Sequence, residues 1–438
     1  MKNNRLIKHM VASMLLVIMT FSLCSCGNVD NKNSGGESST TAPESTLEPV
    51  DENIYFTEAM ADIEKEYYDF INYRNYLVNT NKKLTEDKEL SVLFFGGSLT
   101  SGYGASDEEK YSWRGRTCDW FKSNYQDVEF KFINKAIGES GTYLGTFRLQ
   151  LDVIEEKPDL IFMEYAINDM YFRSDYDDTA MRVETIIREI KAALPETEII
   201  ILITTDNGCL ERNKKGELHT QGQAHEDMAK AYGISSLHIG RALAKECDYS
   251  KEKFADYAVD IVHLNDSGYE IYYKCIKEFL DNSLLKTDFT KVSMPEAKYE
   301  QVCDVLFDGN RTHIQPSAQL VLDSEGLGGV EVAFLDLPYT GNSSFQGVLE
   351  LDDENDIFVL KFVGTEIAMW SNLKNKDYMV SVDGGAYLTK TASEHTPTVI
   401  ARNLEPKEHT VAIKMAKGGS DFKIGAFFSR DTSKASVK

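Results

Sequence analysis

Residues 91–104 read SVLFFGGSLTSGYG, and this stretch decides the fold of the first two thirds of the chain. The apolar run from Val92 to Phe95 is typical of a buried strand, and two glycines end it directly before Ser98. A serine that follows a strand is most often a turn residue or a helix cap. A hydroxyl held where a buried strand breaks into a glycine-rich turn can also be rigid and still open to a small molecule. Ser98 is therefore a candidate nucleophile whose interpretation depends on the rest of the chain.

Strand-like apolar segments alternate with helical patterns on both sides of this stretch. The expected strands are 91–95, 128–133, 160–164, 198–203 and 234–237. The expected helices are 53–84, 113–123, 144–156, 178–194, 221–232 and 267–284. Continuous apolar strands such as Ile199 to Ile203 indicate a sheet that is covered on both faces. We therefore expect an α/β domain over residues 51–290, a three-layer α/β/α sandwich with a mainly parallel sheet.

The pattern changes after residue 300, where short apolar or alternating runs are separated by turn signals. These runs lie at 357–363, 367–370, 378–382, 399–401, 409–415 and 422–428. The sequences DGG at 383–385 and GG at 418–419 are typical of hairpin turns. Without a long helical pattern, residues 300–438 are expected to form an all-β domain, a β-sandwich.

The N-terminus has the features of a targeting segment rather than of a folded element. Three basic residues precede an apolar run at 11–23, which is too short for a comfortable transmembrane helix. The segment ends in LCSCGN and resembles a bacterial lipoprotein signal, which implies cleavage after Ser25 and a lipid on Cys26. An ordinary secretory peptide with incidental cysteines is the alternative. We expect a signal peptide over residues 1–25, a polar flexible tether over 26–50, and a lipid-anchored protein on the extracytoplasmic face of the cell membrane.

Charge and cysteine content exclude several classes of protein. The net charge of −23 argues against a nucleic-acid partner and against close docking on an anionic bilayer. The chain has no CxxC pair and no Cys/His cluster with zinc spacing, so no metal site is expected. The cysteines after the signal are widely spaced and are typical of small buried hydrophobic residues, although one disulfide pair is not excluded by the sequence. They are Cys118, Cys209, Cys247, Cys275 and Cys303.

Polar residues follow the carboxyl ends of the expected strands, and in a parallel sheet those ends meet at one edge. Ser98 follows the first strand, a glycine-containing loop at 134–142 follows the second, and Asn168 follows the third. Asp260 and His263 lie between the last strand and the last helix of the domain. Taken singly, the Asp-x-x-His pair would more often be a helix cap, and the asparagine a turn residue. Together they predict a site at this edge.

These residue types suit acyl transfer. A serine hydroxyl needs a base to take its proton, and His263 is the candidate, with Asp260 to stabilise the imidazolium that forms. The oxygen of a tetrahedral intermediate needs fixed hydrogen-bond donors. The candidate donors are the backbone N–H of Ser98, a backbone N–H of the turn at 138–139, and the side-chain amide of Asn168.

The ordered motifs also carry a family resemblance. The blocks are GGS at 96–98, NxAIG at 134–138, AxND at 166–169 and DxxH at 260–263. They resemble the SGNH, or GDSL-type, hydrolases, and residues 142–170 are similar to a bacterial branch with a GGSIT nucleophile block. The resemblance covers about residues 83–284. It implies that Ser98 is the nucleophile and His263 the base. It also implies that Asp260 orients His263 and that Asn168 is an oxyanion donor. Hydrolysis of this kind needs no metal and no cofactor.

Three positions depart from the pattern of that family. Gly97 replaces the aspartate of the GDSL block, and Ala166 replaces the usual glycine before the asparagine. The oxyanion glycine of the family lies five residues after the asparagine of its block, and in this chain Glu139 occupies that place. We therefore name Gly138 and Glu139 together as the oxyanion turn and leave the donor between them open.

The expected function is a cell-surface serine esterase that removes small acyl groups, most simply acetyl, from a carbohydrate. Residues 358–370 and the run VSVDGG at 380–385 are similar to jelly-roll modules that accompany some carbohydrate esterases. A lipase or thioesterase is the first alternative, but it needs a long apolar groove that residues 103–107 do not suggest. A non-catalytic glycan-binding protein built on the same scaffold is the second.

Other conspicuous side chains have structural interpretations. His219, His225 and His238 are expected to be ordinary surface or packing residues. Trp113 and Arg114 follow the serine turn, where they either line a pocket or, as is commoner, begin a packed helix.

Overall fold

The structure of the protein is a computed structural model. It describes residues 59–60, 62–292, 300–303, 309–310, 349–351, 357–371, 373, 375–393, 397–419 and 422–430. The signal peptide expected over 1–25, with Cys26 and the tether over 26–50, lies outside these residues. Within the described residues, no helix combines the length and the apolar character that crossing a membrane requires.

The α/β domain is built on a six-stranded sheet with the order β1-β6-β5-β4-β2-β3. Its strands are β1 Ile71–Asn72, β2 Glu89–Gly96, β3 Glu129–Asn134, β4 Leu160–Glu164, β5 Glu198–Leu202 and β6 Ser235–Leu237. All neighbours are parallel except β1, which pairs antiparallel with β6. The carboxyl ends of β2 to β6 therefore lie at one edge of the sheet.

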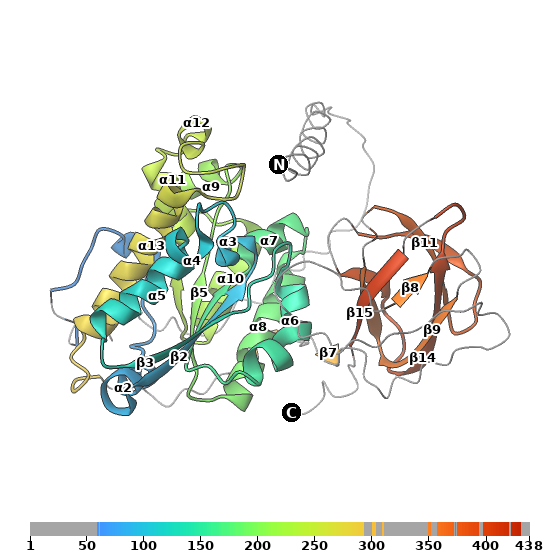
Figure 1. Cartoon of the computed structure of the whole chain (residues 1–438), viewed down its shortest axis with the longest axis horizontal. Helices are drawn as coiled ribbons and strands as arrows, with labels where there is room; N and C mark the ends of the chain where they lie inside the picture. The colour runs from blue at the N-terminus through green and yellow to red at the C-terminus, as the bar shows by residue number, and fades with distance from the viewer. Residues whose placement is uncertain are drawn as a thin grey trace, which may run out of the picture. The chain divides into compact units, whose positions relative to one another are not determined.

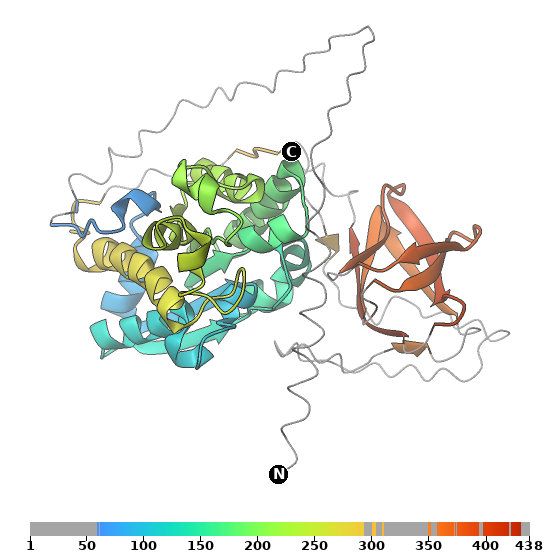
Figure 2. The same ribbon diagram turned by 90° about the horizontal axis from the view of Figure 1, so that it is seen from above.

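Helices cover both faces of this sheet (Figures 1 and 2). One layer holds α5 Trp113–Asn124, α11 Ile239–Glu246 and α13 Asp266–Leu280, and the other holds α6 Thr142–Leu149, α8 Tyr176–Ala193 and α10 Thr220–Ala231. Alternate residues of β2 enter different cores, with Phe94 packed in one and Phe95 in the other. The shorter helical segments are η2 Tyr68–Phe70, α2 Val78–Lys82, η3 Lys83–Asp87, α3 Ser98–Ser101, α4 Glu108–Tyr111, η4 Gln150–Ile154, α7 Ala166–Tyr171, α9 Leu210–Lys214, α12 Lys251–Phe254 and η5 Asp281–Leu285.

The expected three-layer α/β/α fold is confirmed, and the expected strands agree with the observed ones to within two residues. The helix expected over 53–84 is wrong where the structure describes it. Residues 71–72 form a strand, and helix is limited to η2, α2 and η3. Tyr67, Phe70 and Tyr73 suggested a helix by their spacing, but they are buried in the core as parts of an irregular segment. Aromatic spacing does not distinguish the two arrangements, because an extended segment can bury the same side chains.

The second domain consists of two antiparallel sheets. One has the order β12-β11-β14-β9, with β9 Phe358–Gly364, β11 Asp377–Val382, β12 Leu388–Thr391 and β14 Lys407–Met415. The other holds β7 Gly309–Asn310, β8 Leu349–Leu351, β10 Glu366–Ser371, β13 Thr398–Ala401 and β15 Phe422–Arg430. Leu360 and Val411 of the first sheet share one core with Ile367 and Ile424 of the second. The expected all-β sandwich is therefore confirmed, and its jelly-roll assignment stays a prediction, as do the domain limits at 51–290 and 300–438.

The two expected hairpin turns in this domain differ in outcome. Asp383 and Gly384 have positive φ angles of 52° and 71°, and they connect the antiparallel neighbours β11 and β12. Gly418 also has a positive φ, of 78°, but it lies between β14 and β15, which belong to different sheets. The hairpin expected at 418–419 is therefore wrong: the chain crosses from one sheet to the other there.

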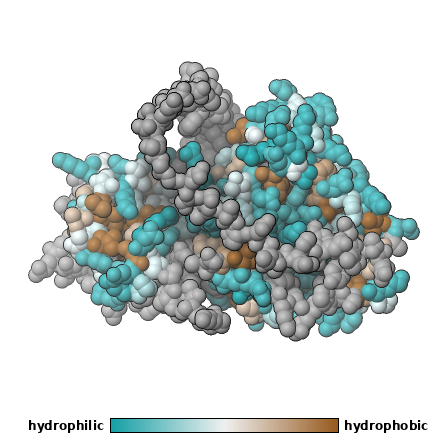
Figure 3. Space-filling view, turned by 180° about the vertical axis from the view of Figure 1, so that it is seen from behind, coloured by the Kyte–Doolittle hydropathy of each residue, from teal (hydrophilic) through white to brown (hydrophobic). Residues whose placement is uncertain are grey.

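The described surface seen from behind is mostly hydrophilic, and its hydrophobic residues form small separate areas (Figure 3). This agrees with the excess of Asp and Glu over Lys and Arg, 70 against 47.

Candidate active site

The turn between β2 and α3 leaves no space for side chains other than hydrogen. A Cβ atom on Gly96 would lie 2.1 Å from Thr100 Oγ1 and 2.5 Å from the backbone oxygen of Glu164. A Cβ atom on Gly97 would lie 2.4 Å from Asn168 Nδ2. Real Cβ atoms do not approach other atoms this closely. The backbone contact requires glycine at position 96, whereas a side chain at position 97 would need the Asn168 amide to move. The turn fixes Ser98 as the first residue of α3, at the carboxyl end of β2.

The structure brings Ser98, His263 and Asp260 together in one hydrogen-bonded series. Ser98 Oγ lies 2.8 Å from His263 Nε2, and His263 Nδ1 lies 2.7 Å from Asp260 Oδ2. The backbone N–H groups of Val262 and His263 donate to Asp260 Oδ1 at 2.8 and 2.7 Å. Burial alone would raise the pKa of Asp260, but these hydrogen bonds outweigh it and hold that pKa below its usual value. An ionised Asp260 can orient His263 and stabilise its protonated form.

The side-chain amide of Asn168 faces the serine turn. It lies on α7, and its Nδ2 donates to the backbone oxygen of Ser140 at 2.6 Å. An amide nitrogen carries two hydrogens, so the second can donate to another acceptor. The contact of Asn168 Nδ2 with Gly97 places this donor beside Ser98.

The turn at 138–139 also lies against Ser98. A Cβ atom on Gly138 would lie 3.9 Å from Ser98 Cβ. Glu139 has a left-handed backbone, with φ of 56°. This conformation favours glycine, and an ordinary residue adopts it at a cost of about 1 kcal/mol. The GDSL-type family has a glycine at this position, which fits such a backbone. Glu139 adopts the same left-handed conformation, and its side chain is exposed.

Sequence reasoning missed the buried pair beneath this turn. Asp169 accepts hydrogen bonds from the backbone N–H and the hydroxyl of Thr142 at 2.8 and 3.0 Å. It also lies 3.0 Å from His225 Nε2, and both side chains are fully buried. His225 was expected to be a surface or packing residue, but it instead ties α10 to the residue next to Asn168. A Cβ atom on Gly141 would lie 2.4 Å from Asp169 Oδ1, so the 138–141 turn rests directly on this carboxylate. The only sequence signal was an aspartate adjacent to Asn168.

A second buried acid supports the turn from the end of β4. The hydroxyls of Thr100 and Thr204 donate to Glu164 at 3.0 and 2.8 Å. Burial raises the pKa of Glu164 to about 7, even though these hydrogen bonds act to lower it. Near neutral pH a large fraction of the molecules therefore holds a neutral carboxylic acid beneath α3.

The start of α5 holds the other end of α3. Trp113 Nε1 donates to the backbone oxygen of Leu99 at 2.9 Å, and the Arg114 guanidinium donates to those of Thr100 and Ser101. The last carbonyls of a helix have no partners within the helix, so these bonds satisfy them. Trp113 and Arg114 are buried, which agrees with a packed helix start and not with a pocket lining.

The remaining histidines and cysteines lie outside this arrangement. His219 and His238 are buried, which agrees with the packing role that was one of the two expected for them. Burial lowers the pKa of His219 to about 4, and His238 Nε2 lies 2.8 Å from Glu226 Oε2. Cys118, Cys209, Cys247 and Cys275 are free thiols, and all four are buried. Within the described ranges, no group of three or more His, Cys, Asp or Glu side chains could hold a metal ion.

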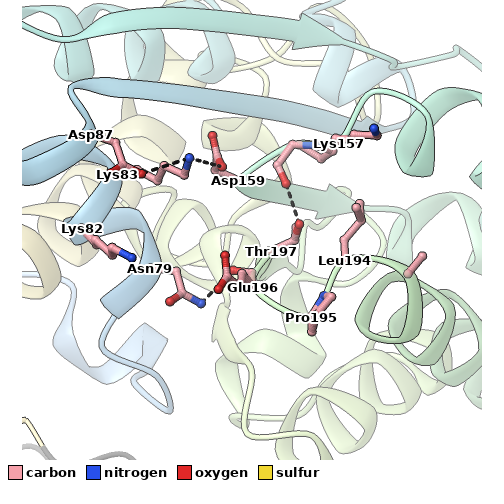
Figure 4. Close-up of a pocket in the computed structure, with 12 residues that line it drawn as sticks. Asn79, Lys82, Lys83, Asp87, Lys157, Asp159, Leu194, Pro195, Glu196 and Thr197 are labelled. Atoms are coloured by element: carbon pink, nitrogen blue, oxygen red, sulfur yellow. Dashed lines mark hydrogen bonds and ion pairs between the residues drawn. The ribbon is translucent and has the colours of Figure 1, made fainter.

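A cavity of about 360 Å³ opens at the opposite edge of the sheet (Figure 4). It is lined by α2, η3 and the residues that precede β4 and β5. The Lys83 ammonium in this cavity is paired with Asp87 at 3.1 Å and Asp159 at 3.7 Å. Because β4 and β5 begin here, the cavity is separated from Ser98 by the length of the sheet.

Fold and site together define a carboxylic ester hydrolase. Residues 94–271 match the model of the GDSL-like Lipase/Acylhydrolase family. The chain is also similar to the crystal structure of a two-domain esterase (CEX) active on acetylated mannans, with 18% identity over 84% of this chain and 99% of the other, at a TM-score of 0.68. A crystal of that esterase with mannopentaose gives 17% identity over 84% and 98%, at a TM-score of 0.67.

An acetylxylan esterase, Axe2 from Geobacillus stearothermophilus, is 18% identical over 44% of this chain and 94% of its own, at a TM-score of 0.38. The search of curated proteins found no match. At these identities the similarity to CEX is one of fold, and its coverage spans both the α/β domain and the β-sandwich. The resemblance to GDSL-type hydrolases is thereby confirmed.

The Asp169 carboxylate offers a test of how the site is held. We expect Asp169→Ala to lower kcat on p-nitrophenyl acetate by about 100-fold, because Asn168 and the 138–141 turn lose their common support. Asp169→Asn keeps an acceptor for Thr142 and is expected to lose less. Steady-state kinetics, with thermal melting to verify folding, measure both variants. A folded Asp169→Ala protein with the kcat of the parent would contradict this role.

Proposed function

We propose that this protein is a serine esterase that removes acetyl groups from saccharides. The observation that carries the proposal is the hydrogen-bonded series of Ser98, His263 and Asp260 at the carboxyl edge of the sheet. The match of residues 94–271 to the acylhydrolase family model supports the reaction type. The similar fold of an esterase described as active on acetylated mannans supports the substrate class.

In the proposed reaction, Ser98 Oγ attacks the acyl carbon while its proton passes to His263 Nε2. The carbonyl oxygen becomes negative and receives hydrogen bonds from Asn168 and from the backbone N–H groups of Ser98 and of the 138–139 turn. The bond to the sugar oxygen then breaks, and this oxygen takes the proton from His263. Water activated by His263 releases acetate from the acylated serine, which restores the free hydroxyl. Asp260 stabilises the imidazolium in both steps.

We expect a short acyl group at Ser98 rather than a long one. The turn with Gly138 lies against the serine on one side, and the Asn168 amide lies beside Gly97. A lipase would instead need a site that buries most of a long chain.

The proposal is tested with p-nitrophenyl acetate, butyrate and octanoate and with acetylated mannan and xylan. We expect acetate esters to be preferred, and Ser98→Ala to lower kcat by at least about 10⁴-fold. Ser101→Ala is the matched control, since it removes a hydroxyl from the same helix and should retain most of the activity. Equal activity of Ser98→Ala and the parent would refute the mechanism. A preference for octanoate would favour the lipase alternative.

We also propose that a lipid on Cys26 anchors the mature protein at the extracytoplasmic face of the membrane. The proposal rests on the lipoprotein-like sequence LCSCGN alone, which lies outside the described residues. Growth of a producing bacterium with labelled palmitate should mark the parent and not Cys26→Ala. Label that persists in this variant would exclude the anchor.

A further inference from the structure

The loops that carry Ser98 and His263 expose three large hydrophobic side chains. Tyr103, Val259 and Ile261 are 51%, 54% and 52% exposed. Exposed hydrophobic side chains that lie together are candidates for an interaction site, and Tyr103 and Val259 lie on loops in contact with each other. We call these three side chains the Tyr103 surface.

The Tyr103 surface is fixed in place although its side chains are exposed. The backbone N–H of Tyr103 donates to the backbone oxygen of Ser98 at 3.0 Å. The backbone oxygen of Tyr103 accepts a hydrogen bond from the buried Tyr269 hydroxyl at 2.7 Å. A Cβ atom on Gly104 would lie 3.0 Å from Val259 Cγ2, so the Tyr103 loop abuts Val259. The backbone N–H of Val259 in turn donates to the oxygen of His263 at 2.8 Å. A rigid surface loses little entropy when a ligand binds to it.

This surface lies on the side of the base. The rings of Tyr103 and His263 are 4.6 Å apart between centroids, with an interplanar angle of 67°. The base that takes the proton of Ser98 later gives it to the departing alcohol oxygen, so this oxygen must lie within hydrogen-bond distance of His263 Nε2. The alcohol part of the ester therefore lies beside His263. The acyl oxygen instead faces Asn168 and the 138–139 turn.

We propose that the Tyr103 surface binds the sugar ring from which the acyl group is removed, with the apolar face of the ring packed on Tyr103. The inference rests on the proposed function and adds the residues that select the saccharide. A sugar ring has flat C–H faces that pack on aromatic side chains, and its hydroxyl groups can remain in water. Half-exposed side chains suit such a ligand, whereas a long acyl chain would need burial of most of its surface.

The test compares three esters: an acetylated manno-oligosaccharide, ethyl acetate, which has no ring in its alcohol, and ethyl octanoate. The readout is the kcat/KM of the saccharide divided by that of ethyl acetate. For Tyr103→Ala we expect this ratio to fall about tenfold, the effect of one lost aromatic contact. Tyr103→Phe keeps the ring and should keep the ratio. Leu285→Ala removes another large exposed side chain, away from the site, and is the matched control.

The possible results separate this inference from the function on which it rests. An equal loss on saccharide and ethyl acetate would mean that Tyr103 only positions His263, and it would overturn the inference. A selective loss on ethyl octanoate would assign the surface to an acyl chain and overturn it as well. If Tyr103→Ala leaves kcat/KM unchanged on every ester, the sugar subsite is refuted but the proposed function is not. A parent protein that hydrolyses ethyl acetate but no acetylated saccharide refutes the proposed substrate class, and the sugar subsite with it.

Discussion

The close approach of β4, α3 and the Asn168 side chain to Gly96 and Gly97 is the constraint on which the site depends. The backbone oxygen of Glu164 and the Thr100 side chain lie against Gly96, and the Asn168 amide lies against Gly97. Because no side chain fits at Gly96, β4 and α3 meet directly there, and Ser98 is held beside the Asn168 amide. Activity that depends on preorganised donors requires such rigid placement.

Buried polar pairs beneath this point supply the remaining support. Asp169 joins α7, α6 and α10 through Thr142 and His225. Glu164 joins α3 to the loop after β5 through Thr100 and Thr204. Removing one partner of such a pair leaves a buried polar group unsatisfied, which costs more than the hydrogen bond itself contributes. The edge of the sheet therefore has a polar interior below a solvent-exposed site.

The sequence predicts the strands and the proximity of Ser98, His263 and Asp260 for a physical reason. Strands β4 and β5 are buried at every position and apolar except at Glu164 and Glu198, because both of their faces are covered. The site residues follow strand ends or lie in the loop before α13. The irregular segment around Phe70 was misjudged because its aromatic spacing fits a helix as well as an extended chain. The Asp169–His225 pair joins residues 56 positions apart. His225 could not be identified as the partner of Asp169 before the packing of α10 was known. The exposure of Tyr103 is likewise a property of the folded surface.

The central claim is that the His263–Asp260 pair makes Ser98 nucleophilic, and covalent trapping measures this most directly. The protein is incubated with a fluorophosphonate, which reacts with activated serines, and the modified peptide is identified by mass spectrometry. We expect a single adduct on Ser98, none on Ser101, and a labelling rate that falls by orders of magnitude in His263→Ala. An unmodified Ser98 in an active enzyme, or labelling of Ser98 at the same rate without His263, would contradict it.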